Sequence, residues 1–184
     1  MNLFTIYSVI LYFLWTVGGT SDQEMYIATN GTVNFKSNAP LEVIEAYSNS
    51  AKGIIKVEDK SVAYSIDISS FQGFRNKLQR EHFLENYMEV TNYPKASFLG
   101  KIIENIDFSS EGEFKVRAKG ILSIHGVGQE RIIRSTIKIG QGIINLSSDF
   151  TVSLEDHNIT VPKVVNQKIA EKIIVSVNTT FIKK

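Results

Sequence analysis

The chain contains no cysteine in its 184 residues. This absence excludes disulfide bonds, thiolate metal sites, cysteine nucleophiles and a cysteine-linked lipid anchor. Without disulfide bonds, the folded state must be stabilised by its own apolar core. A chain of this length supplies one domain with a substantial core, so we expect a single domain.

An excess of charge is also absent, because 20 lysine and arginine residues stand against 19 aspartate and glutamate residues, a net charge of +1. This balance gives no general attraction to nucleic acid or to an anionic membrane, and we expect no nucleic-acid partner. A local cluster of charged side chains can still bind a charged partner. Lys115, Arg117 and Lys119 share one face of a predicted strand, a pattern that is usually only solvated but could meet anionic lipid or a partner.

The motifs of common enzymes are missing. The chain has no G-x-S-x-G nucleophile elbow and no glycine-rich phosphate loop before a helix. Its histidines lie far apart, and His82 with Glu85 offers two ligands where a closed metal site needs about four. An enzyme using His82 would need a second titratable group, and only Glu81 and Glu85 are close in sequence. We therefore expect no enzyme, no metal and no cofactor.

Long apolar runs are scarce, and the clearest one extends from residue 3 to residue 17, before the first charged side chain at Asp22. This run is typical of a secretory signal peptide, and the small residues at 18–21 suit cleavage. An uncleaved anchor is the alternative, but the run is short for a bilayer span of about 20 residues. We predict a signal peptide over residues 1–21, a mature domain over residues 22–184, and a periplasmic or secreted location.

Alternation of apolar and polar side chains dominates the rest of the chain. In residues 114–124, apolar side chains share one face, and basic or hydroxyl side chains take most of the other; residues 61–69 and 143–154 repeat the pattern. Period two predicts strands with one face in the core and one in water, which is typical of antiparallel sheets. Further strands are predicted at residues 25–36, 41–49, 52–58, 96–108, 130–139 and 171–182.

About eight strands favour a closed antiparallel β-barrel, because closure removes exposed sheet edges. A two-sheet sandwich is the alternative. Residues 74–88 are the exception, since their apolar and aromatic side chains recur at three- and four-residue spacing and predict a helical cap. Pro94 prevents this helix from continuing. Residues 155–171 form a second irregular stretch, which we expect to be a flap.

Two separated motifs carry a resemblance to a known family. The first combines Glu-His-Phe at 81–83, an aromatic at Tyr87, and Asn-Tyr-Pro-Lys-Ala-Ser-Phe at 92–98; the second is Leu-Ser-Ile-His-Gly-Val at 122–127. Together they resemble the YceI-like family of exported lipid-binding proteins, over most of the mature chain. The resemblance implies a lipocalin-like barrel with an apolar tunnel that holds an isoprenoid chain or another amphiphile. It implies no catalytic activity.

An eight-stranded barrel can either fill with side chains or hold one small ligand, and alternation alone leaves both open. The resemblance favours the hollow form, so we interpret the chain as an exported protein that sequesters or transports an isoprenoid-like or fatty amphiphile. A filled-barrel interaction module is the alternative. The predicted tunnel wall comprises Tyr64, Ile66, Phe98, Phe114, Val116, Leu122, Leu146, Phe150 and Val152; the predicted mouth comprises Phe74, Leu78, His82, Phe83 and Tyr87.

The three histidines have different expected roles. His82 is expected either to hydrogen-bond a polar head group or to brace the helix against the barrel rim. His125 precedes Gly126 at a strand end and is expected to shape the turn. His157 lies in the flap and is expected to be solvated. A transient membrane contact and a homodimer are compatible with this interpretation.

Overall fold

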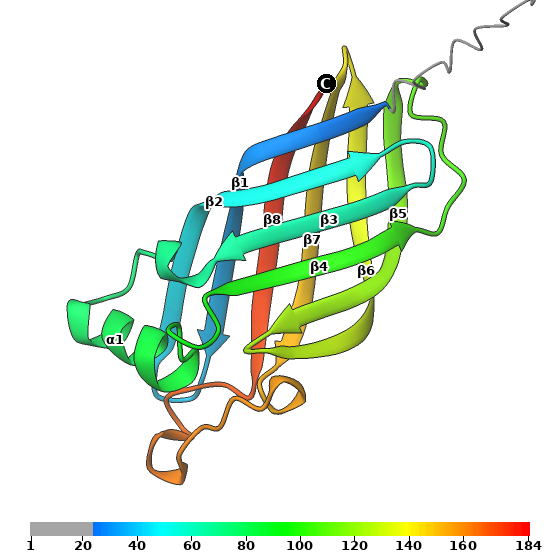
Figure 1. Cartoon of the computed structure of the whole chain (residues 1–184). Coiled ribbons are helices and arrows are strands. Elements are labelled where there is room, and N and C mark those ends of the chain that lie inside the picture. Colours follow the sequence, from blue (N-terminus) through cyan, green and yellow to red (C-terminus); the bar gives the residue numbers. More distant parts are fainter. Residues whose placement is uncertain (1–23) are drawn as a thin grey trace, which may run out of the picture.

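The computed structural model describes residues 24–184, and the predicted signal peptide over residues 1–21 lies outside them. Eight strands form one sheet, in which each strand is antiparallel to the next and β8 pairs with β1 (Figure 1). The strands are β1 Met25–Asn38, β2 Val43–Lys56, β3 Ser61–Asp67, β4 Lys95–Ile102, β5 Gly112–Ile124, β6 Val127–Gly140, β7 Ile143–Ser153 and β8 Lys172–Lys183. The predicted antiparallel barrel is confirmed, and the two-sheet sandwich is wrong.

Strand β2 is one continuous element where the sequence predicted two, at residues 41–49 and 52–58. The polar residues around Ser48 suggest a turn, but Ser48 is buried and its hydroxyl lies 2.7 Å from that of Ser70. Because this buried hydroxyl has a partner, the strand continues through the polar stretch. Register shifts on either side of Gly31 in β1 accommodate the stretch as a bulge.

Strand β4 ends at Ile102, which is shorter than the strand predicted at 96–108. In the following segment, the carboxylate of Asp107 accepts hydrogen bonds from the backbone N–H of Ser109 and the hydroxyl of Ser110. Side chains of this type offer the backbone an alternative to the sheet. The connection between β4 and β5 is therefore a loop.

One end of the barrel carries the β2–β3 and β6–β7 turns and the C-terminus (Figure 1). This end is filled with side chains. Its buried core consists of Tyr26, Ala28, Ile55, Val62, Ile102, Phe108, Val116, Ile137, Ile139, Ile144 and Phe181. The rings of Tyr64 and Phe181 pack edge to face, with centroids 5.6 Å apart. Gly53 permits this contact, because a Cβ there would lie 2.8 Å from the Phe181 ring. We call this the closed end.

The opposite end carries the helical segment predicted at residues 74–88. Helix α1 spans Lys77–His82, and the π-helical turn η2 spans Phe83–Tyr87. The helix begins later than predicted because Asn76 is its N-cap and accepts a hydrogen bond from the backbone N–H of Gln79. The predicted cap is present at this end, which we call the capped end (Figure 1).

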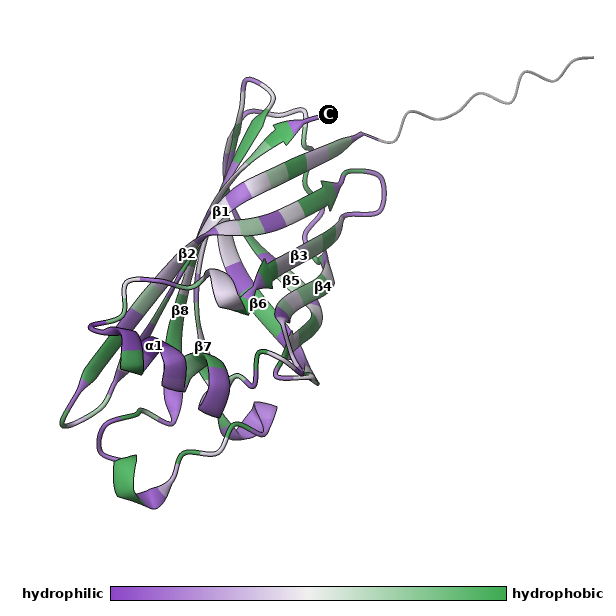
Figure 2. Cartoon of the chain, turned by 60° about the vertical axis from the view of Figure 1, so that its left-hand side comes forward, coloured by the Kyte–Doolittle hydropathy of each residue, from purple (hydrophilic) through white to green (hydrophobic). Residues whose placement is uncertain are grey.

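Short 3-10 turns complete the capped end. Turn η1, Ile68–Ser70, follows β3, whereas η3, Glu155–His157, and η4, Lys163–Val165, lie in the long connection from β7 to β8. This connection contains the irregular stretch predicted over 155–171, and it lies at the same end as α1 in both views (Figures 1 and 2). Within residues 24–184, no helix is both long and apolar enough to span a lipid bilayer.

Candidate functional site

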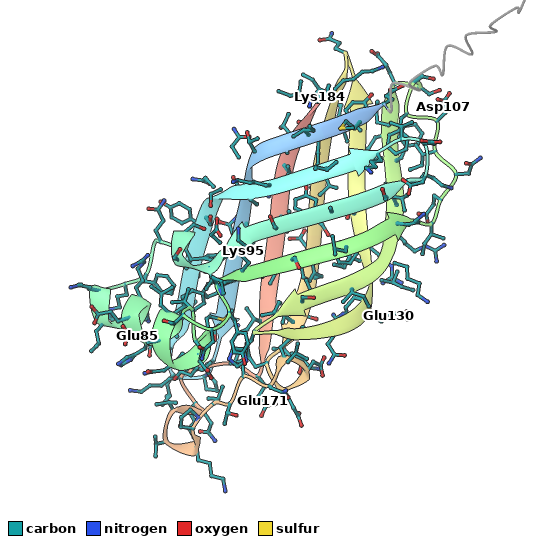
Figure 3. The ribbon with its side chains drawn as sticks, in the orientation of Figure 1. Glu85, Lys95, Asp107, Glu130, Glu171 and Lys184 are labelled. Carbon is teal, nitrogen blue, oxygen red and sulfur yellow. The ribbon has the colours of Figure 1, made fainter. Side chains whose placement is uncertain are left out.

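An apolar cavity of about 540 Å³ lies between the closed end and the helical cap. All eight strands contribute to its wall, and α1, η2 and the β7–β8 connection surround its opening. Figure 3 marks the closed end by Asp107 and Lys184 and the capped end by Glu85 and Glu171. The volume is within the range of about 300–1,000 Å³ typical of small-molecule sites. The barrel is therefore hollow over part of its length, and the filled-barrel alternative describes only the closed end.

The predicted site residues gather around this cavity, with one exception. Its wall includes Tyr64, Ile66, Phe98, Val116, Leu122, Leu146, Phe150 and Val152, and its opening includes Phe74, Leu78, His82, Phe83 and Tyr87. The predicted place of Phe114 in the wall is wrong, because Phe114 packs against the closed-end core instead of lining the cavity. Phe114 and Val116 share a face of β5, but Phe114 is two residues nearer the closed end. Ligand binding by the lining residues stays a prediction.

The interior of the cavity is uncharged. Among the lining residues in the described part of the chain, the acidic and basic side chains besides His82 are Glu42 and Lys168, both from segments at the opening. Burial raises the pKa of Tyr64 and of Tyr87, so both phenols are neutral at physiological pH. Burying an unpaired charge is costly. The interior therefore suits an apolar chain, and a polar group of a ligand belongs at the opening.

Phenylalanine rings hold the cap on the barrel. Phe35 of β1 stacks on Phe83 of η2 with centroids 5.2 Å apart, and Phe74 lies 5.1 Å from Phe83. Phe71 contacts both partners, 5.4 Å from Phe35 and 5.8 Å from Phe83. Such pairs contribute about 0.5–1.5 kcal/mol each beyond their burial. The sequence prediction missed Phe35 and Phe71, although Phe35 follows Val33 at strand spacing in a predicted strand.

His82 lies at the opening and is exposed. Its imidazole has no hydrogen bond or ion pair within residues 24–184, and both expected roles of His82 stay predictions. Its neighbour Gln79 does connect the helix to the barrel, because the Gln79 Nε2 donates to Glu42 Oε1 at 3.0 Å. The imidazole of His82 is therefore available to a polar group at the opening.

His157 is fully buried, which overturns the expectation that it is solvated. Its Nδ1 lies 3.0 Å from the carbonyl oxygen of Val127, and its own carbonyl oxygen lies 3.1 Å from Nδ1 of His125. These contacts fasten η3 to the β5–β6 turn. His125 has a φ of 50° and Gly126 a φ of 72°, so the predicted role of His125 in the turn is confirmed. Nothing in the sequence indicates that His157 is buried, because the burial arises only when the flap folds back onto the barrel end.

The sequence model of the YceI-like domain matches residues 24–181. The chain belongs to the YceI-like family. The YceI-like barrel is also similar to solved structures. Their sequence identities to this chain are low, so the similarity shows the fold alone. A polyisoprenoid binding domain from Saccharophagus degradans is 13% identical, with a TM-score of 0.73 over 88% of this chain and 99% of that one.

Two further structures share the YceI-like fold. BcnA from Burkholderia cenocepacia is 16% identical, with a TM-score of 0.67, and the match covers 82% of this chain and 95% of that one. The YCEI protein of Campylobacter jejuni is 17% identical, with a TM-score of 0.60 over 76% of this chain and 84% of that one. A search of curated proteins finds no match.

The two YceI-like motifs of this chain meet in space at the capped end. The ring of Tyr93, in the first motif, packs edge to face on the imidazole of His125 in the second, with centroids 4.5 Å apart. A Cβ at Gly126 would lie 2.5 Å from the Tyr93 ring, so the contact requires glycine there. The motifs therefore join the segment after the cap to the β5–β6 turn beside the cavity.

Proposed function

We propose that this YceI-like protein is exported and that it sequesters or transports an isoprenoid-like or fatty amphiphile without catalysing a reaction. The observation that carries the proposal is the uncharged cavity, closed at one end and lined from all eight strands. Each buried CH₂ group contributes about 0.8 kcal/mol, so an apolar chain binds there without polar partners. The similar structure from Saccharophagus degradans is described as a polyisoprenoid binding domain, which supports an isoprenoid cargo.

The cavity implies an orientation for the cargo. The apolar chain lies along Phe98, Val116 and Leu122, which line the wall, and the polar group stays near His82 and Lys168 at the opening. Entry and exit use the capped end, because the closed end is filled. The cap and the β7–β8 connection then act as a gate. A cargo this apolar is loaded and released during transient contact with a membrane, and a homodimer is not required.

Binding and release are sufficient as the mechanism. General acid–base catalysis needs a titratable group within hydrogen-bond reach of the reacting atom and suitably tuned. At the cavity opening, Glu42 accepts from the amide of Gln79, and His82 has no side-chain partner within the described residues. Neither group is paired as a nucleophile with a base.

Organic extraction of the protein purified from its own host, followed by mass spectrometry, tests the proposal. We expect a long-chain amphiphile in a stoichiometric amount. An empty extract, together with no uptake of an added polyprenol or fatty acid, would refute the carrier function. Cell fractionation tests export: we expect the protein outside the cytoplasm, with an N-terminus close to residue 22.

A further inference from the structure

Large apolar side chains project into solvent around the cavity opening. Leu41 is 66% exposed in the β1–β2 turn, Leu78 is 59% exposed on α1, and Val164 is 90% exposed on η4. Val43, next to the turn, is 51% exposed. Exposed apolar side chains scattered singly are ordinary, but these gather at one end of the molecule, around the entrance of an apolar cavity.

The segments that carry these side chains are joined to one another. The backbone N–H of Leu41 donates to the carbonyl oxygen of Gln167 at 2.9 Å, which ties the β1–β2 turn to the segment after η4. The hydrogen bond from Gln79 to Glu42 ties α1 to the same turn. Residues 41–43, 75–85 and 162–168 therefore form one continuous border, which we call the rim. In Figure 2 the segment at the tip of the capped end carries hydrophobic residues next to hydrophilic ones.

The rim carries an excess of positive charge. Its cations are Arg75, Lys77, Arg80, Lys163 and Lys168, and its acids are Glu42, Glu81 and Glu85, which leaves a net charge of +2. Glu42 accepts from Gln79, and Glu81 pairs with Lys77 at 3.4 Å. The side chains of the cations Arg75, Lys163 and Lys168 and of the acid Glu85 have no partner within residues 24–184, so unpaired cations outnumber unpaired acids in the rim.

Further acidic groups of the capped end lie near the β5–β6 turn. Asp156 on η3 lies 3.8 Å from Arg131 of β6, and Glu89 lies 3.3 Å from His125 at the β5–β6 turn. Glu155 belongs to the same turn η3, which His157 fastens to Val127. These acids therefore lie apart from the cations of η4, whereas Glu42, Glu81 and Glu85 lie within the rim.

We propose that the rim docks on an anionic lipid bilayer, so that the cavity opens directly onto the acyl chains. This inference rests on the proposed carrier function. Projecting apolar side chains beside unpaired cations supply the two signals, insertion and charge attraction, that a stable peripheral contact needs. A bound apolar chain then passes between the cavity and the bilayer without crossing water.

Vesicle co-sedimentation of the full protein tests the docking. Vesicles of phosphatidylcholine with an equal part of phosphatidylglycerol are compared with vesicles of phosphatidylcholine alone, and we expect tighter binding to the anionic ones. Each cation near an anionic surface is worth about 1 kcal/mol, which is about five-fold in affinity. We therefore expect Lys163→Gln and Arg75→Gln each to weaken binding to anionic vesicles about five-fold, and Leu41→Ser with Val164→Ser to weaken binding to both vesicles.

The control variant is Leu99→Ser with Ile182→Ser, because these side chains are 60% and 63% exposed but lie outside the rim. We expect it to bind vesicles like the unchanged protein. Equal binding by the rim and control variants would overturn the docking surface. Absence of binding to both kinds of vesicle would also overturn the docking on lipid. That result would indicate that a protein or a second copy of the chain covers the rim.

Cargo content is measured on the same samples by extraction and mass spectrometry. None of the four substituted rim residues lines the cavity, so each variant should retain its cargo. Cargo without vesicle binding refutes the docking and leaves the carrier function standing. Rim-dependent vesicle binding without any cargo supports the docking and refutes the carrier function.

Discussion

Replacement of Val116 by a larger side chain separates a hollow barrel from a filled one. Val116 is 4% exposed and lines the inner part of the cavity, where the packed core gives way to empty space. In a filled core, Val116→Trp would overpack its neighbours and cost about 1–3 kcal/mol or more. For a domain of this size, that cost lowers Tm by roughly 2–4 °C per kcal/mol.

The structure predicts a different outcome, because the cavity of about 540 Å³ can accept the indole. We expect Val116→Trp to change Tm by less than about 4 °C, since the cost stays below about 1 kcal/mol. We also expect it to abolish retention of a long-chain cargo, because the indole occupies the inner part of the site.

Phe114→Trp is the matched control, on the same strand and the same face but packed against the closed-end core. It adds less volume than Val116→Trp, and because Phe114 is only partly buried and lies outside the cavity we expect it to leave the cargo in place. The assay pairs a thermal melt with extraction and mass spectrometry of each variant. A Val116→Trp protein that retains its cargo and loses more than about 1 kcal/mol of stability would refute the assignment of the cavity.

Three further predictions concern the capped end and one surface turn. Gly126→Ala should destabilise the fold by about 1–3 kcal/mol in urea, because φ is 72° and the new Cβ would meet the Tyr93 ring at 2.5 Å; unchanged stability would contradict the contact. His157→Ala should speed hydrogen exchange in residues 155–171, since the bond to Val127 is lost, while exchange at the closed end stays unchanged. Asp59 should titrate at a pKa of about 2, lowered first by the hydrogen bonds that it accepts from Ser61. These hydrogen bonds therefore support the turn above about pH 4 and are lost as pH falls through 2. An NMR titration that gives Asp59 a pKa near 4 would contradict these hydrogen bonds.

The sequence by itself determined much of the architecture. Alternation, as from Phe114 to Ile124 except at Gly120 and Ile121, sends side chains to two faces of a strand, and this local rule predicted most strands and most inward residues correctly. Pro94 and the aromatic spacing of residues 74–88 likewise predicted a helical element before β4, because helix boundaries respond to local chemistry. The two motifs then indicated the family.

Only the tertiary structure decided where the barrel is full and where it is empty. Phe114 and Val116 share a face of β5 and both touch the closed-end core, yet only Val116 also borders the cavity, because side chains from other strands determine how much space remains at each level of the barrel. The burial of His157 likewise depends on the flap folding onto the β5–β6 turn. Alternation specifies which way a side chain points, but the space it meets is shared among strands that are distant in sequence.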